Sequence, residues 1–131
     1  MNFEPGLQRR EVAQGDFRSG LERRIAKNLG STEYEYERWF LRYTVPSRVA
    51  RYTPDFVLAN GIVVEAKGRF VAADRNKHLL IRDQHPDLDL RFVFSNSKTR
   101  ITKRSRTSYG DWCEKHGFIY ADRTIPEEWV T

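Results

Sequence analysis

The stretch that decides the fold runs from residue 53 to residue 67 and reads TPDFVLANGIVVEAK. Two short apolar runs, 56–58 and 62–64, are rich in residues that favour strands. Between them lies Ala59-Asn60-Gly61, a combination typical of tight turns. The stretch therefore predicts a β-hairpin, with one charged residue before its first strand and two at the end of its second.

The length of the turn decides which of these charged residues face each other. A two-residue turn would place Asp55 opposite Ala66, whereas a three-residue turn with Gly61 in the left-handed region places Asp55 opposite Glu65. Because side chains alternate along a strand, Glu65 and Lys67 point to the same face. Only the three-residue turn brings all three charged groups together, so a function that needs all three requires that register.

Two carboxylates on neighbouring strands suit a hard, oxygen-seeking cation such as Mg²⁺, which keeps several waters and binds substrate phosphate. In such a site Lys67 would hold or activate the attacking water. The alternative is structural: Asp55 belongs to a turn before a strand, and Glu65 and Lys67 form an exposed pair. Charged residues make up 31% of the chain, so a scattered pattern of this kind leaves both interpretations open.

Composition limits the remaining possibilities. The chain has 131 residues, which fits one compact domain, and its formal charge of +5 favours a polyanionic partner without distinguishing DNA, RNA and an anionic membrane. Cys113 is the only cysteine, so an intrachain disulfide and a cysteine-rich zinc site are excluded. No apolar run approaches the roughly 20 residues needed to span a bilayer, and we expect a cytoplasmic protein with no membrane partner.

The N-terminal part predicts an arm followed by a helix. Residues 1–16 show no periodicity and are expected to form a flexible basic arm, in which Arg9 and Arg10 would touch phosphate. Apolar residues then recur every fourth position over 17–29, which predicts a helix with one apolar stripe. Glu22 has two interpretations here: a capping-box residue that binds a backbone N–H at the helix start, or a member of the metal site.

The middle of the chain predicts strands and one further helix. The alternation over 34–45 changes phase near Arg38, which implies a bulge or a change of strand partner. A short break is expected at 46–50. A helix is expected over 74–85 and a strand over 88–94, so that strand, helix and strand form a crossover.

The densest cationic stretch is residues 98–106, which contain five basic residues and no acid. It would be a solvated loop in a protein without a charged partner, yet five like charges repel one another unless a polyanion neutralises them. We therefore favour phosphate contact for Lys98, Arg100, Lys103, Arg104 and Arg106.

Beyond these local patterns, the chain resembles the phage endonuclease I family of Holliday-junction resolvases, in matching order and spacing from about residue 17 to Trp129. The segments that carry the resemblance are FRSGLE (17–22), YTPDF (52–56), NGI (60–62), KHLLIR (77–82), TSYG (107–110) and CEKHG (113–117).

The resemblance implies an α/β, restriction-endonuclease-like mixed sheet flanked by helices, of the PD-(D/E)xK nuclease superfamily. It also implies metal dependence, selectivity for branched DNA, and a domain-swapped homodimer. The nuclease domain would cover 17–131, with 17–45 exchanged between subunits across a bridge at 46–50. The catalytic residues that carry over are Glu22, Asp55, Glu65 and Lys67.

The resulting hypothesis is a structure-specific endodeoxyribonuclease that resolves four-way junctions by paired nicks. One or two Mg²⁺ ions, or Mn²⁺, would be held by Asp55, Glu65 and the Ala66 carbonyl, with Glu22 completing a second metal site. Two alternatives remain: a general or restriction-like PD-(D/E)xK nuclease that cuts linear duplex, and a non-catalytic module that binds branched DNA.

Overall fold

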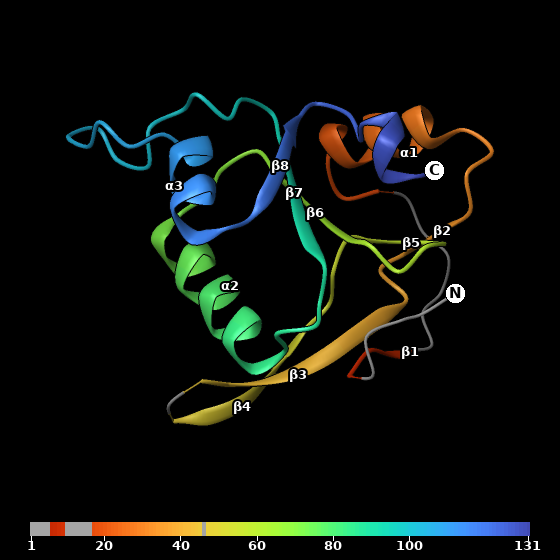
Figure 1. The fold of residues 1–131 in the computed structure, drawn as a ribbon, viewed down its shortest axis with the longest axis horizontal. Helices are drawn as coiled ribbons and strands as arrows, with labels where there is room; N and C mark the ends of the chain where they lie inside the picture. The colour runs from red at the N-terminus through yellow and green to blue at the C-terminus, as the bar shows by residue number, and fades with distance from the viewer. Residues whose placement is uncertain (1–5, 10–16, 46) are drawn as a thin grey trace.

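The computed structural model describes residues 6–9, 17–45 and 47–131 as two sheets with three α-helices (Figure 1). The larger sheet has the strand order β2-β5-β6-β7-β8, and the smaller one has the order β1-β3-β4. The elements are β1 (Gln8–Arg9), α1 (Gly20–Leu29), β2 (Tyr34–Tyr36), β3 (Trp39–Val45), β4 (Arg48–Tyr52), β5 (Phe56–Leu58), β6 (Val63–Lys67), α2 (Ala72–Gln84), β7 (Leu90–Phe94), α3 (Tyr109–His116), β8 (Ile119–Asp122) and the 3-10 turn η1 (Glu127–Trp129).

The hairpin of β5 and β6 has the register that the three-residue turn predicts. Phe56 pairs with Val64 and Val57 pairs with Val63. Gly61 has a φ of 90°, a conformation that glycine adopts without strain. Continuing the same register by one residue places Asp55 opposite Glu65, so the hairpin prediction is confirmed at the level of residue pairing.

The mixed character of the larger sheet comes from its connections. β5 runs antiparallel to β2 and β6, whereas β7 runs parallel to β6 and β8 runs parallel to β7. The predicted helix over 74–85 is α2, and the predicted strand over 88–94 is β7, so the expected crossover is confirmed. The edge strand β8 was not predicted. The expected α/β mixed sheet flanked by helices is therefore present.

The phase change in the aromatic stretch 34–45 marks a change of sheet. β2 ends at Tyr36 and pairs with β5, and β3 begins at Trp39 and pairs with β1 and β4. Between them Glu37 has a φ of 51°, which turns the chain from one sheet toward the other. The predicted change of strand partner is confirmed.

The short break expected at 46–50 is wrong from Arg48 onward. Arg48–Tyr52 form β4, which folds back on β3 in an antiparallel pair that begins with Val45 opposite Arg48. Pro46 lies outside the described residues. Only one position of β4 is buried and most are exposed, so the sequence shows little of the apolar alternation that indicates a strand. Exchange between subunits across this region stays a proposal.

Part of the segment expected as an arm is a strand. Leu7 is buried, and Gln8 and Arg9 pair with Phe40 and Trp39 of β3. The rest of the predicted arm, residues 1–5 and 10–16, including Arg10, lies outside the described residues.

The larger sheet separates two apolar cores. On one face, α2 and α3 pack through Ile81, Trp112 and Cys113 against strand residues that include Phe92 and Phe94. On the other face, the apolar stripe of α1 and the C-terminal turn pack in a second cluster: Ile25, Leu29, Phe56, Leu58, Val64, Val93, Ile125 and Trp129. Among the described residues, no helix is long and apolar enough to cross a membrane.

Candidate active site

Asp55 and Glu65 are held in place by the backbone of each other's strand. The Ala66 N–H donates to Asp55 Oδ2 at 2.9 Å, and the Asp55 N–H donates to Glu65 Oε1 at 3.3 Å. Both residues are buried, with exposed fractions of 4% and 5%. Burying two carboxylates is costly, so their presence at the end of the hairpin indicates a site with a chemical role.

A tyrosine orients Glu65 further. The buried Tyr52 hydroxyl donates to Glu65 Oε1 at 2.8 Å, so this oxygen accepts two hydrogen bonds. The second oxygen, Oε2, lies 3.4 Å from Lys67 Nζ. Glu65 is thus fixed through one oxygen while the other faces the charged groups of the site.

Lys67 lies between two carboxylates. Its Nζ is 3.4 Å from Glu65 Oε2 and 3.3 Å from Asp74 Oδ1, and Asp74 comes from the first turn of α2. Burial alone would lower the pKa of Lys67, but the charges of Glu65 and Asp74 outweigh it and the pKa is raised. Lys67 therefore stays a protonated ammonium group, which can hold a water or a phosphate oxygen and stabilise negative charge.

The position of Glu22 bears on its two interpretations. Ser19 caps α1, because its Oγ accepts a hydrogen bond from the Glu22 N–H at 3.0 Å. The Glu22 carboxylate faces the other way, where its Oε2 accepts from the Tyr36 hydroxyl at 2.6 Å. Its exposed fraction is 5%. Glu22 thus points across to β2, which supports the functional interpretation over the capping box.

Three carboxylates meet between α1 and the hairpin. One oxygen each of Glu22, Glu37 and Asp55 lies within 4.8 Å of the others. Arg18 spans part of this cluster, with its Nε 2.9 Å from Glu37 and its Nη2 3.8 Å from Asp55. A set of hard carboxylate oxygens around one point fits Mg²⁺ or Mn²⁺, and Arg18 supplies positive charge at its edge.

Burial and charge repulsion in the site both affect the pKa of Asp55. Burial, followed by the charge of Glu65, raises the pKa of Asp55 to about 9. Burial also raises the pKa of Glu65. A divalent cation among these oxygens would favour their ionised forms, so metal binding is expected to release protons and to tighten as pH rises.

We expect the metal-free protein to lose stability as pH rises from about 4 to about 9. The folded state holds the Asp55 proton over this range and the unfolded state does not, so unfolding becomes easier at higher pH. Asp55→Asn should remove this contribution. In the presence of a chelator, the Tm of the variant should exceed that of the original protein by a margin that grows with pH. A constant margin would contradict the shifted pKa.

The structure brings the predicted residues together with partners that the sequence did not reveal. Asp55, Glu65 and Lys67 share the end of the hairpin, and Glu22 reaches Asp55 from α1. The converging carboxylates nevertheless include Glu37, whereas the predicted metal set named Glu65 and the Ala66 carbonyl. Three further residues were missed: Glu37, Arg18 and Asp74. An acidic residue at the third position of α2 was the only signal for Asp74.

The predicted DNA-contacting residues divide into two groups. The five basic residues of 98–106 are all exposed, in the long loop between β7 and α3 (Figure 1). Within the described part of the chain, none of them forms an ion pair. Arg9 differs, because its guanidinium binds Glu35 at 3.1 Å.

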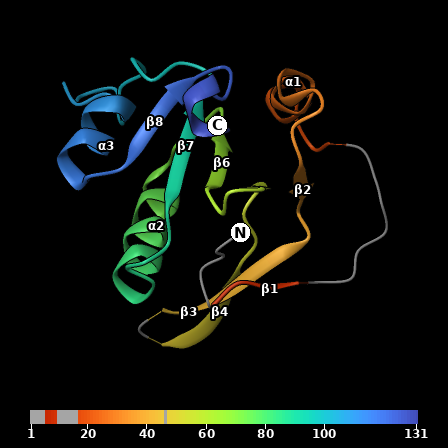
Figure 2. The same cartoon turned by 45° about the vertical axis from the view of Figure 1, so that its right-hand side comes forward.

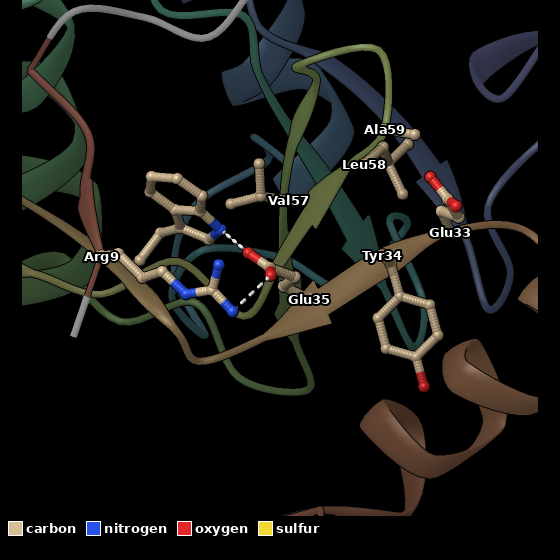
Figure 3. A pocket seen from close by; sticks show the side chains of 8 residues that line it. Arg9, Glu33, Tyr34, Glu35, Val57, Leu58 and Ala59 are labelled. Atoms are coloured by element: carbon tan, nitrogen blue, oxygen red, sulfur yellow. Dashed lines mark hydrogen bonds and ion pairs between the residues drawn. The ribbon is translucent and has the colours of Figure 1, made fainter. Parts of the chain in front are cut away.

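Arg9 and Glu35 line a pocket of about 530 Å³ beside β2 and β5 (Figure 3). Trp39 also donates a hydrogen bond to Glu35, through its indole N–H. Arg9 could contact phosphate only by breaking its ion pair with Glu35. In this structure the charge of Arg9 is therefore already paired with a carboxylate.

A mixed sheet whose hairpin presents Asp55, Glu65 and Lys67 beside a helix carboxylate has the arrangement that the sequence led us to expect of a PD-(D/E)xK nuclease. Comparison with known sequences defines the type further. The chain belongs to the phage endonuclease I family, whose profile matches residues 5–131. It is therefore an endonuclease.

Two relatives cover most of the chain. Endonuclease I of Escherichia phage T7 is 55% identical over 118 residues, which are 88% of this chain and 79% of the relative. Endodeoxyribonuclease 1 of Enterobacteria phage T3 is 54% identical over 112 residues, which are 84% of this chain and 74% of the relative.

Proposed function

We propose that this protein is a metal-dependent endodeoxyribonuclease that resolves four-way and other branched DNA junctions by paired nicks. The observation that carries the proposal is the buried pair of Asp55 and Glu65 beside the Lys67 ammonium group, with carboxylate oxygens of Glu22 and Glu37 within 4.8 Å of Asp55. Membership of the phage endonuclease I family supports the same activity. If the protein is phage-encoded, it would act in the host cytoplasm.

The site residues have distinct roles in this proposal. Asp55, Glu65 and the Ala66 carbonyl would hold Mg²⁺ or Mn²⁺, and Glu22 would complete a second metal site, to which the position of Glu37 adds a further carboxylate. The bound metal would supply Lewis-acid activation of the scissile phosphate and of water. Lys67 would position that water and stabilise the negative charge that develops on the phosphate.

Paired nicks require two related sites, and we propose a homodimer that exchanges residues 17–45 across a bridge at 46–50. In Figure 2, α1 and β2 stand apart from α2 and α3, on the far side of β5 and β6. Along the chain, α1 and β2 are connected to the β5–β6 hairpin through β3 and β4, and β2 also pairs directly with β5. A two-fold exchange would preserve every pairing while changing which chain supplies it.

Cleavage assays on matched substrates test this function. We expect nicks near the branch point of a four-way junction in Mg²⁺, loss of nicking in a chelator, and recovery on adding Mg²⁺ or Mn²⁺. A linear duplex with the sequence of one arm is the control. Equal cleavage of the duplex would favour the restriction-like alternative, and metal-independent binding without cleavage of any DNA would favour the non-catalytic module.

Replacing two of the basic residues in 98–106, such as Lys103 and Arg104, with Ala should weaken binding of all DNA forms. Each lost phosphate contact is expected to reduce the salt-dependence slope by about 0.9, or by one to two units for a pair. Binding of labelled duplex and junction DNA at several salt concentrations measures this slope. An unchanged slope would show that the loop does not contact DNA.

A further inference from the structure

The outer face of the β3–β4 hairpin carries two arginines directly opposite each other. Arg42 of β3 pairs with Arg51 of β4, and both are exposed. Toward the tip of the hairpin, Val49 lies on the same face, with an exposed fraction of 65%. We call Arg42, Val49 and Arg51 the hairpin face.

The opposite side of this hairpin is covered. Leu41, Tyr43 and Tyr52 alternate with the exposed arginines and belong to the core shared with α2. The C-terminal end of α2 also binds the β3 backbone, because Gln84 Nε2 donates to the Thr44 carbonyl at 2.6 Å. Arg42 and Arg51 therefore project away from the body of the domain.

A pair of this kind is unfavourable unless something neutralises it, because like charges directly opposite on a sheet repel. In the described residues, neither Arg42 nor Arg51 forms an ion pair with an acid. Arg51 stacks its guanidinium on the Phe40 ring, with 4.6 Å from Cζ to the ring centroid. Stacking fixes the plane of the group while its N–H donors stay available at the edge, a geometry suited to phosphate oxygens.

The hairpin face is also connected directly to the active site. β4 leads through Thr53 and Pro54 into Asp55, so Arg51 is four residues from a site carboxylate, at most about 13 Å along an extended chain. A DNA duplex carries a phosphate on each strand every ~3.4 Å of its axis. A duplex arm that leaves the scissile phosphate along β4 would pass these arginines.

We propose that the hairpin face binds the phosphate backbone of one duplex arm of the substrate. The inference rests on the proposed function, which supplies DNA as the polyanion. The basic loop of 98–106 lies at the other end of the molecule, at the top in Figures 1 and 2, whereas the β3–β4 hairpin lies at the bottom. Two separated cationic elements would let one subunit hold two different arms of a branched DNA.

The proposal does not depend on the exchange of residues 17–45. If that segment is exchanged, β3 of one chain would pair with β4 of its partner in the same register. Arg42 and Arg51 would then still lie opposite each other, each from a different chain.

Binding measurements on Arg42→Gln, Arg51→Gln and the double variant test the proposal without reading catalysis. Labelled four-way junction and duplex DNA are titrated in a chelator at several salt concentrations. Each single variant should lower the salt slope by about 0.9 for each subunit bound to the DNA, and the double variant by about 1.8 for each such subunit. Arg91→Gln is the matched control, because it removes a guanidinium that Asp89 already binds at 2.9 Å and 3.0 Å.

Thermal unfolding separates DNA contact from a structural role. Arg42→Gln relieves the repulsion across the strand pair, so its Tm should equal or exceed that of the original protein while its DNA affinity falls. A lower Tm with an unchanged slope would overturn the proposal, as would an unchanged slope in the double variant. Loss of binding to anionic lipid vesicles, with DNA binding intact, would assign the face to a membrane instead.

Together with the cleavage assay in Mg²⁺, these binding measurements distinguish failure of this inference from failure of the proposed function. If the original protein binds junction DNA through these arginines but does not nick it in Mg²⁺, the nuclease function is contradicted and DNA binding by the hairpin face is supported. If the protein is an active nuclease but the double variant has an unchanged salt slope, the nuclease function is supported and DNA binding by the hairpin face is contradicted.

Discussion

Glu65→Gln and Lys67→Ala are each expected to reduce junction cleavage to background while leaving junction binding nearly intact. Glu65→Gln keeps the shape of the side chain and an oxygen for the Tyr52 hydroxyl, which donates at 2.8 Å, but removes the charge that a metal requires. Lys67→Ala removes the ammonium group that would stabilise negative charge on the phosphate. Loss of one such group typically costs about 10²–10³-fold in turnover.

Single-turnover cleavage of a labelled four-way junction at saturating protein measures the chemical step apart from binding. Exposed residues of the same types outside the site provide matched controls, Glu128→Gln and Lys115→Ala. Both controls should retain full activity. Near-original turnover in Glu65→Gln or Lys67→Ala would contradict the assignment of the site.

Local signals were sufficient to predict the hairpin and the three charged residues on it. Turn chemistry at Asn60-Gly61 limited the register to two choices, and the two-residue period of a strand placed Glu65 and Lys67 on one face. The requirement that Asp55 join them selected the register that the structure has. Local signals were also sufficient to predict the first helix, because its apolar stripe and its Ser19 cap lie within one segment.

The missed residues of the site depend on contacts between distant segments. Glu37 reaches Asp55 because the chain takes a φ of 51° between two sheets, a conformation that no residue pattern indicates for glutamate. Asp74 reaches Lys67 only because α2 begins beside the end of β6. Both placements follow from tertiary packing, so periodicity and spacing carried no information about them.

Strands without an apolar alternation were missed for a related reason. β1 has two exposed residues and β8 has none that is buried, so each depends on its neighbouring strand for its conformation. β4 was hidden by the proline and serine before it and by its exposed arginines. Edge strands of this kind are defined by hydrogen bonds to a partner, which a sequence does not display.

Restored nicking in a mixture of two inactive variants is the second large effect that we expect. Glu22→Gln alters the segment proposed to be exchanged, whereas Glu65→Gln alters the hairpin that receives it. In an exchanged heterodimer both substitutions fall in one site, and the other site contains neither. Without exchange, every site would keep one substitution and remain inactive.

The two inactive proteins are unfolded together, refolded, and assayed for nicking of a four-way junction in Mg²⁺. Random pairing should make about half of the dimers heterodimeric, each with one intact site, so the product should be single nicks in place of paired ones. Each variant refolded alone, and the two mixed without unfolding, are the controls and should stay inactive. In the single chain, Glu22 already lies beside Asp55 through its own α1. Absence of nicking in a verified heterodimer would therefore show that each site is built within one chain.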